Sequence, residues 1–170
     1  MLHVVLVEPE IPPNTGNIAR LCLAAGARLH LVEPLGFSLE EKALRRAGMD
    51  YWDKCDVRTW PSLEALRQES PGARFLYLTK KVDRPYWAEQ FKPGDHLVFG
   101  RETKGLPESL LAANAEHCLS IPMRQEARSL NLATAAGIVL YEAIRQLDAL
   151  RQPIEPGKKS ILIFPEEMPW

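Results

Sequence analysis

Three polar segments of this 170-residue chain combine side chains that bind anions or hydroxyl groups with glycines that admit a close ligand. They are residues 14–20 (NTGNIAR), residues 100–107 (GRETKGLP) and residues 121–131 (IPMRQEARSLN). Signatures of phosphate loops (GxxxxGK[ST]), serine hydrolases (GxSxG) and zinc peptidases (HExxH) are absent, as is a GxGxxG turn after the first apolar run. The segments therefore point to a binding or catalytic site outside these familiar chemistries.

The first segment directly follows an apolar run and opens a helix. In a structural interpretation, Asn14 or Thr15 caps the helix and Arg20 is a solvated cation. In a functional one, these polar side chains and the free N–H groups face an anion or hydroxyl at the carboxyl end of a parallel strand. The structural interpretation explains the cap but not the whole polar set, so both stay open for this segment alone.

The second and third segments also have two interpretations. Gly100 and Gly105 allow positive φ or close approach of the backbone to a ligand, and Glu102 places a carboxylate between them. A simple turn uses glycines too. Ser129 fits an N-cap and Asn131 a first-turn polar residue, so only the three segments together are specific.

Six apolar runs that alternate with helical patterns are expected to position these segments. They are residues 2–7, 28–32, 57–60, 74–79, 96–99 and 118–121. The alternation predicts the α/β class, with a parallel sheet covered by helices on both faces in an α/β/α arrangement.

Helical patterns fill the intervals between these strands. The first helix is expected to begin near Asn14 or Thr15 and to end at Gly26. Three more are expected at residues 38–48, from a capping box at Ser38 and Glu41 to Gly48, at residues 62–69 and at residues 107–113.

The last predicted helix, about residues 130–150, is apolar on nearly all sides. One face carries Leu132, Ala136, Val139, Ala143, Leu147 and Leu150, and Ala133, Ala135, Ile138, Leu140 and Ile144 extend the apolar surface. Such a helix must be buried on more than one side. In a chain this short, a second subunit is the expected partner, so the sequence predicts a homodimer.

Length and composition favour one domain over residues 1–150, followed by a C-terminal extension over residues 151–170. The sequence shows no secretory signal and no apolar run long enough to span a bilayer, so no membrane partner is expected. Cys22, Cys55 and Cys118 are odd in number and form no CxxC pair. This cysteine usage favours a reducing cytoplasm over a disulfide framework or a zinc site.

The formal net charge of −1 gives the chain no overall attraction to nucleic acid. An RNA partner would therefore need a local basic patch. Three clusters qualify: Lys42, Arg45 and Arg46; Lys80, Lys81 and Arg84; and Arg101, Lys104, Arg124 and Arg128. Each cluster by itself also fits an ordinary solvated surface.

Taken in order, NTGNIAR, FGRETKGLP and IPMRQEARSLNLATAAGIVLYEA resemble the three motifs of the SPOUT methyltransferases, and the resemblance covers about residues 2–150. The short length and the stretches EPEIPPNTGNIARLC and LRRAGMDY are similar to the branch that methylates the ribose 2′-hydroxyl of the tRNA wobble nucleotide, position 34. The resemblance implies S-adenosyl-L-methionine as cofactor, S-adenosyl-L-homocysteine as product, tRNA as partner and no metal.

The resemblance also implies a fold whose C-terminal part threads through a loop to make a deep trefoil knot, against the general rarity of knots. Periodicity alone does not reveal it. The family's cofactor residues correspond here to Leu78, Thr79, Gly100, Glu102, Ile121, Met123, Ser129, Leu130 and Asn131. Apolar members are expected to sandwich the adenine while backbone groups bond its edge.

The implied reaction is in-line attack of the hydroxyl on a methyl group, with removal of the hydroxyl proton. Arg20 is the position that the family links most closely to catalysis. Because a guanidinium is a poor base, Arg20 is expected to hold an RNA phosphate and to favour ionisation of the nearby hydroxyl, in the site of the other subunit. Asn14, Asn17 or Ser129 is expected to orient that hydroxyl.

Arg20, Arg46 and Tyr141 are the candidate RNA contacts, although Tyr141 fits a subunit interface equally well. Three other functions remain open on the sequence. They are 2′-O-methylation of another RNA site in ribosomal RNA or tRNA, a non-enzymatic dimeric RNA-binding or assembly factor, and a flavodoxin-like nucleotide binder. The polar residues of all three motifs together favour an enzyme, because binding alone would not require them all.

Overall fold

The computed structural model describes residues 1–39 and 52–148. Its six strands are β1 (His3–Val7), β2 (Arg28–Val32), β3 (Val57–Trp60), β4 (Phe75–Leu78), β5 (His96–Phe99) and β6 (Cys118–Leu119). They form one parallel sheet in the order β3-β2-β1-β5-β4-β6. The six expected strands are confirmed, although β1, β4 and β6 are shorter than the apolar runs that predicted them.

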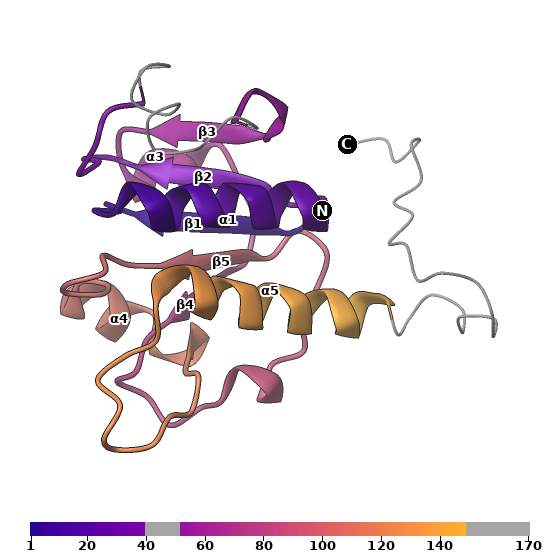
Figure 1. The fold of residues 1–170 in the computed structure, drawn as a ribbon. Coiled ribbons are helices and arrows are strands. Elements are labelled where there is room, and N and C mark those ends of the chain that lie inside the picture. The colour runs from indigo at the N-terminus through magenta and orange to yellow at the C-terminus, as the bar shows by residue number, and fades with distance from the viewer. Residues whose placement is uncertain (40–51, 149–170) are drawn as a thin grey trace, which may run out of the picture.

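Helices cover both faces of this sheet (Figure 1). The long helices α1 (Pro12–Ala25) and α5 (Leu132–Asp148) lie side by side on one face. The short helices α3 (Leu63–Gln68) and α4 (Glu108–Ala113) pack on the other, and the 3-10 turns η1 (Trp52–Lys54), η2 (Tyr86–Ala88) and η3 (Ala115–His117) lie in connections. The expected α/β/α arrangement is confirmed.

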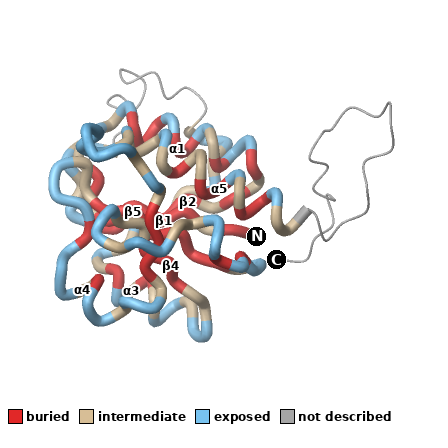
Figure 2. The backbone as a smooth tube through the Cα atoms, turned by 90° about the horizontal axis from the view of Figure 1, so that it is seen from below, coloured by how far each residue is buried: buried red, intermediate tan, exposed pale blue. Residues whose placement is uncertain are grey.

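Each face of the sheet has its own apolar core. Val4 and Leu6 of β1 point toward α1 and α5, whereas Val5 and Val7 of the same strand point toward α3 and α4. Figure 2 shows the buried segments running through the strands and the inner sides of the helices, with exposed residues in the connecting loops. Burial on both faces explains why β1, β2, β4 and β5 read as apolar runs, whereas β3 is half-buried or exposed along its length.

The first helix begins earlier than the sequence predicted. Ile11 is its N-cap residue and Pro12 its first residue, and a second proline follows. Proline lacks an N–H group and has a fixed φ that suits the first turn of a helix, so the two prolines extend the helix backwards. Asn14 and Thr15 are buried inside it, and the expectation that either caps it is wrong. Its end at Gly26, in the left-handed conformation at φ 61, is confirmed.

The last helix is capped by Asn131 and not by Ser129, the residue that the sequence offered as its N-cap. The side-chain oxygen of Asn131 accepts hydrogen bonds from the N–H groups of Ala133 at 2.9 Å and Thr134 at 3.3 Å. Asn131 therefore caps α5, and Ser129 does not. The reason is position: α5 begins at Leu132, immediately after Asn131.

One side of α5 is buried as predicted. Four of its residues, Ala136, Val139, Leu140 and Ala143, are fully buried in the core shared with α1 and the sheet. On the opposite side, Ile138 is half-buried and Tyr141 is exposed. The second apolar side of the helix is thus open on the surface of a single chain.

Some expectations fall on residues 40–51 and 149–170 and lie outside the described residues. They are the helix closed by Gly48, the cluster Lys42, Arg45 and Arg46, the last two residues of the final helix and the C-terminal extension. Within residues 1–39 and 52–148, no helix is long and apolar enough to cross a membrane.

Candidate active site

A cavity of about 420 Å³ opens at the carboxyl ends of β4, β5 and β6. The loops that follow these strands form its walls, and the first turns of α1 and α5 contribute Asn14 and Leu132. Ligands of parallel α/β sheets bind at this end of the strands. The expected cofactor residues all line the cavity: Leu78, Thr79, Gly100, Glu102, Ile121, Met123, Ser129, Leu130 and Asn131.

Two glycines fold the loop after β5 into a tight hairpin. Arg101 and Gly105 form an antiparallel bridge, in which the Gly105 N–H donates to the Arg101 carbonyl at 2.9 Å. A Cβ atom on Gly100 would lie 2.2 Å from the carbonyl carbon of Gly105, and Gly105 itself has φ +69. Gly100 is therefore required by close approach to its own hairpin and Gly105 by its positive φ.

The carboxylate of Glu102 reaches from this hairpin to the start of α1. One oxygen accepts the N–H of Glu10 at 2.9 Å, and the other accepts the N–H of Ile11 at 3.2 Å and the side-chain amide of Asn14 at 3.1 Å. The first N–H groups of a helix have no partner within the helix. Glu102 supplies the cap that Ile11 cannot provide, and a negative charge is favourable at this helix end.

Asn14 extends the contact to α5. Its side-chain oxygen accepts a hydrogen bond from the amide of Asn131 at 2.8 Å, and Asn131 in turn caps α5. Because the Asn14 amide must donate to a carboxylate, its oxygen must face Asn131, so this orientation is determined by its partners. Glu102, Asn14 and Asn131, here called the polar bridge, join the three sequence motifs.

The remaining walls of the cavity are largely apolar. Leu78, Ile121 and Met123 are half-buried and face the cavity from the ends of β4 and β6. The N–H of Thr79 donates to the carbonyl of Leu119 at 2.9 Å, which continues the β4–β6 pairing to the cavity edge. A mostly apolar cavity with a few polar groups suits a ligand that has an aromatic ring and a polar end.

Arg20 and Tyr141 lie outside this cavity. Asn14 is buried toward the cavity, whereas Asn17 and Arg20 are on the exposed side of α1. Tyr141 is 44% exposed on α5. One chain therefore brings together the predicted cofactor residues but not Arg20 or Tyr141, and Arg46 lies outside the described residues.

Four basic residues were not assigned to the site by the sequence, although they belong to the predicted basic clusters. Lys80, Lys81, Arg101 and Lys104 all line the cavity. Lys80 and Lys81 directly follow β4 and its Thr79, and Arg101 and Lys104 belong to the hairpin after β5. These four residues could have been identified from the sequence, because they follow the ends of predicted parallel strands, where ligands bind.

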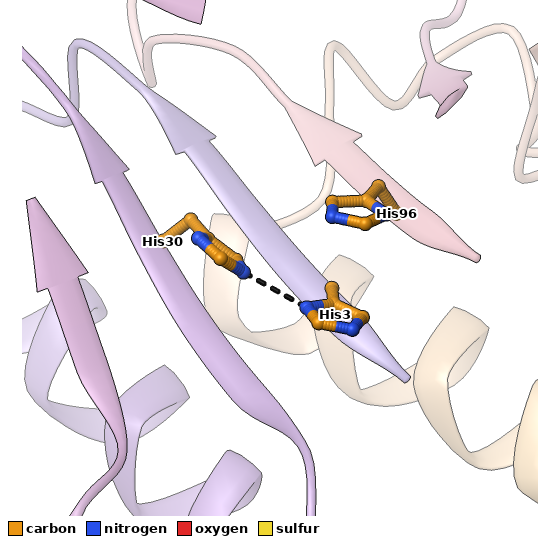
Figure 3. A group of neighbouring side chains, drawn as sticks. All are labelled: His3, His30 and His96. Carbon is orange, nitrogen blue, oxygen red and sulfur yellow. Dashed lines mark hydrogen bonds between the residues drawn. The ribbon is translucent and has the colours of Figure 1, made fainter. Parts of the chain in front are cut away.

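A cluster of three histidines lies near the amino ends of the strands, away from the cavity (Figure 3). His3 of β1 and His96 of β5 are paired in the sheet, and their rings stack with centroids 4.2 Å apart and an interplanar angle of 7°. His3 Nδ1 and His30 Nε2 are 2.9 Å apart, and Trp60 Nε1 donates to His30 Nδ1 at 2.9 Å. The sequence did not reveal this cluster because it depends on strand register.

The hydrogen bonds favour neutral histidines over a metal centre. The Trp60 indole only donates, so His30 Nδ1 carries no proton and His30 Nε2–H donates to His3. A metal ion on His30 Nε2 would require this proton to leave, and the stacked rings of His3 and His96 do not point to a common in-plane position. Burial, reinforced by the neighbouring histidines, lowers the pKa of His3 to about 3 and that of His30 to about 2, and burial also lowers the pKa of His96.

A known family and several known enzymes are similar to this chain over most of its length. Residues 1–141 match the model of the SpoU rRNA methylase family. The chain is 48% identical over 148 residues to the tRNA (cytidine(34)-2′-O)-methyltransferase of Escherichia coli (strain K12), covering 86% of this chain and 94% of that protein. It is 48% identical over 149 residues to the protein of the same name from Methylovorus glucosotrophus (strain SIP3-4), covering 87% and 97%.

Solved structures agree with these matches. A structure described as "Structural insights into the 2-OH methylation of C/U34 on tRNA" superposes with a TM-score of 0.81 at 47% identity, covering 88% of this chain and 97% of that one. An S-adenosylmethionine-bound rRNA methyltransferase from Sinorhizobium meliloti gives a TM-score of 0.74 at 31% identity, covering 86% of this chain and 56% of that one.

Proposed function

The chain belongs to the SpoU rRNA methylase family, and from this premise we propose that it methylates the ribose 2′-hydroxyl of the tRNA wobble nucleotide, a cytidine or modified uridine. The methyl donor is S-adenosylmethionine, as in structural relatives of the family. The observation that carries the proposal is 48% identity across almost the whole length of the E. coli enzyme named for this reaction.

The family's deep trefoil knot is part of the proposal. It requires the C-terminal part of the chain to pass through a loop and to stay in contact with it. Such contacts are present: the Tyr86 N–H donates to the Ser120 carbonyl at 2.8 Å, and Lys80 Nζ donates to the Arg128 carbonyl at 2.9 Å. These bonds join the loop after β4 to the segment between β6 and α5.

S-adenosylmethionine fits the cavity by size and by the character of its walls. Leu78, Ile121, Met123 and Leu130 supply apolar contacts for an adenine ring, and the backbone near Thr79 and Gly100 supplies polar groups for its edge and ribose. The bound cofactor supplies an electrophilic methyl group on a sulfonium, so the proposed reaction needs no metal ion to activate it. The polar bridge holds the walls of the cavity together through hydrogen bonds within the chain, and in this proposal it does not bond the cofactor.

The chain's own polar residues divide the remaining tasks. Arg20 holds an RNA phosphate and stabilises negative charge that develops on the attacking hydroxyl. Ser129, at the cavity lining, orients this hydroxyl. Asn14, first expected to do the same, has both ends of its amide engaged by Glu102 and Asn131, so we assign it a positioning role.

A homodimer completes the proposed site. Leu23 on α1 and Tyr141 on α5 are large side chains exposed by 41% and 44% on neighbouring helices. Apolar groups exposed together favour a subunit interface. In the proposed two-fold pairing through α1 and α5, Arg20 on the exposed side of α1 reaches the other subunit's cavity. Tyr141 and Arg46 remain proposed RNA contacts.

The function is tested with labelled S-adenosylmethionine and purified tRNAs. The label is expected on the ribose of nucleotide 34, as identified by nuclease digestion and mass spectrometry of the nucleosides. A tRNA that already carries a 2′-O-methyl group at this nucleotide is the matched control and should accept no label.

Ribosomal RNA is the second substrate to include, because the matching family model and the S. meliloti relative are both named for rRNA methylation. Label in ribosomal RNA with none in tRNA would overturn the wobble assignment while keeping 2′-O-methylation. Label on a base, or on no RNA, would overturn the proposed reaction itself.

A further inference from the structure

Basic side chains surround the cavity although the whole chain is slightly acidic. Four of them line it: Lys80 and Lys81 after β4, and Arg101 and Lys104 after β5. Two more, Arg124 and Arg128, are exposed in the loop between β6 and α5. With a net charge of −1 for the chain, this is a local concentration of positive charge at one end of the sheet.

Two of these cations are neutralised by carboxylates of the same chain. Lys81 Nζ lies 2.6 Å from a carboxylate oxygen of Glu108, and this contact lowers the pKa of Glu108. Arg101 forms an ion pair with Glu8. Both pairs tie a loop residue to a neighbouring segment, so the charge of each cation is already matched within the chain.

The other four cations have no carboxylate partner among the described residues. Lys80 Nζ donates to the backbone carbonyl of Arg128 at 2.9 Å, which fixes the ammonium in place without cancelling its charge. Lys104, Arg124 and Arg128 are exposed. Lys80, Lys104, Arg124 and Arg128 are here called the cationic rim, and they come from the three loops that follow β4, β5 and β6.

Two acidic residues that border the hairpin after β5, Glu102 and Glu10, are already occupied. The Glu102 carboxylate accepts three hydrogen bonds within the polar bridge and from the start of α1. Glu10 accepts the N–H and the hydroxyl of Thr103. The rim therefore presents four cations that no carboxylate of the described residues pairs, as expected of a surface that binds a polyanion.

We propose that the cationic rim binds backbone phosphates of the substrate RNA on either side of the methylated ribose, while Lys81 and Arg101 remain paired with carboxylates of their own chain. This inference rests on the proposed function, because the cavity must hold the reacting ribose. It assigns backbone contacts that position the nucleotide and are independent of base sequence.

The test uses two adjacent lysines that line the same cavity. Lys80→Met and Lys81→Met remove the same charge from neighbouring positions. Binding is measured with a tRNA that carries a 2′-deoxy wobble nucleotide, so that no turnover occurs. Lys80→Met should weaken binding about tenfold at low salt and reduce the slope of log affinity against log salt by roughly 0.7 to 0.9, the contribution of one phosphate contact.

Lys81→Met should change tRNA affinity less than about twofold, because its charge is already paired with Glu108. Lys80→Arg keeps the charge and should restore binding, which separates the charge from packing. Lys104→Met, a residue with no bonded partner in the described parts of the chain, should repeat the Lys80→Met result without loosening a loop. Because these lysines line the cofactor cavity, S-adenosylmethionine affinity is measured beside tRNA affinity, and tRNA affinity should fall more than cofactor affinity in Lys80→Met and Lys104→Met.

Equal losses of tRNA affinity in Lys80→Met and Lys81→Met would overturn the proposed role of the rim. A salt dependence of tRNA affinity that is unchanged in both Lys80→Met and Lys104→Met would overturn it too. Failure of the proposed function has a separate readout, because the wild-type protein would then place no label on nucleotide 34. If the rim variants methylate tRNA normally and bind it with unaltered affinity, the proposed role of the rim is wrong while the proposed function stands.

Discussion

Glu102, Asn14 and Asn131 satisfy one another's hydrogen bonds at the edge of the cavity. Each was expected to face a ligand, because carboxylates and amides commonly do. In the structure, the carboxylate caps α1 and the two amides connect that cap to the start of α5. We therefore propose that these side chains act on the reaction by fixing the two helix ends that border the cavity.

The variant Glu102→Gln tests this role. A glutamine places an NH₂ group against an N–H donor of Glu10, Ile11 or Asn14, leaving at least one donor without its acceptor. The free energy of unfolding should fall by about 1–3 kcal/mol, as measured by chemical denaturation, and kcat should fall with it. Glu108→Gln, the same change at an exposed carboxylate, is the control and should leave both quantities near wild type. Wild-type stability in Glu102→Gln would contradict the capping role.

The variant Asn131→Asp separates helix capping from the polar bridge. Its carboxylate still accepts the N–H groups of Ala133 and Thr134, and its charge suits a helix N-terminus. It has no donor for the Asn14 oxygen, and Asn14 cannot turn around because its amide donates to Glu102. Melting temperature should therefore change little, while cofactor affinity falls by about tenfold or more. If both quantities fell in proportion, the bridge would have no role beyond stability.

The sequence predicted the membership of the site better than its internal contacts. Motif residues such as Gly100 and Ile121 follow strand ends, and parallel strands bring their carboxyl ends together, so their convergence was predictable. The position of Arg20 was not, because six residues along a helix from Asn14 turn the side chain to another face. The pairing of Lys81 with Glu108 depends on loop geometry that no periodicity encodes.

At the scale of secondary structure, the parallel register gives the amino end of the sheet its own chemistry. It sets His3 beside His96 and brings His30 within hydrogen-bonding distance of His3. His96 Nδ1 donates to the Gly94 carbonyl, and its Nε2 is buried without a partner among the described residues. Arg28 also lies near all three rings and disfavours their protonation.

This cluster predicts a loss of stability in mild acid. In the unfolded chain these histidines titrate near their ordinary value of about 6.5, whereas burial lowers the folded pKa of His3 to about 3 and of His30 to about 2. Between these values only the unfolded state takes up the protons, so stability is fully present above about pH 6.5 and falls as the pH drops toward 3. Chemical denaturation at pH 7.5 and 5.5, above the usual carboxylate range, measures the change.

Two phenylalanine substitutions test whether the histidine cluster is the source of this pH dependence of stability. His96→Phe removes one titrating ring while keeping an aromatic surface beside His3 and Phe75, so the pH dependence should become shallower. His117→Phe removes the one histidine outside the cluster and should leave the wild-type dependence. An equal pH dependence in wild type and His96→Phe would show that the cluster does not contribute.

The elements themselves were largely readable from the chain, with errors at their ends. Strands buried on both faces give apolar runs, which identified the central strands, whereas β3 is half-buried or exposed along its length and gave only a weak run. The run at residues 118–121 overestimated β6, because only Cys118 and Leu119 pair with β4. The start of α1 was misplaced because Asn14 and Thr15 resemble caps, whereas Pro12 already has a helical φ and Glu102 supplies the cap from a distant segment.

At the scale of the whole molecule, the proposed role of Arg20 requires two chains as the unit of activity. In this proposal, neither the cavity alone nor the exposed side of α1 alone contains a complete site. A particle of dimeric mass at micromolar concentration in analytical ultracentrifugation is the first requirement of this arrangement, and a monomeric mass would rule it out.

Mixed dimers test the sharing directly. Arg20→Ala removes the proposed phosphate contact, and Gly100→Ala forces a Cβ into the backbone of Gly105 and should abolish cofactor binding. Each variant alone should be inactive. Refolding the two together gives half heterodimers, each with one intact site, so activity should recover to about a quarter of wild type. Mixtures of each variant with itself are the control, and no recovery in the heterodimer would place Arg20 in its own chain's site.

The polar bridge has a consequence for synthesis on the ribosome. Asn14 and Glu102 are 88 residues apart in the chain, and Asn14 and Asn131 are 117 apart, so the cavity needs both ends of the domain. Contacts at such separations form late in folding. A nascent chain that has not yet released Asn131 lacks one wall of the cavity, and cofactor capture thus becomes a marker that translation has passed the final helix.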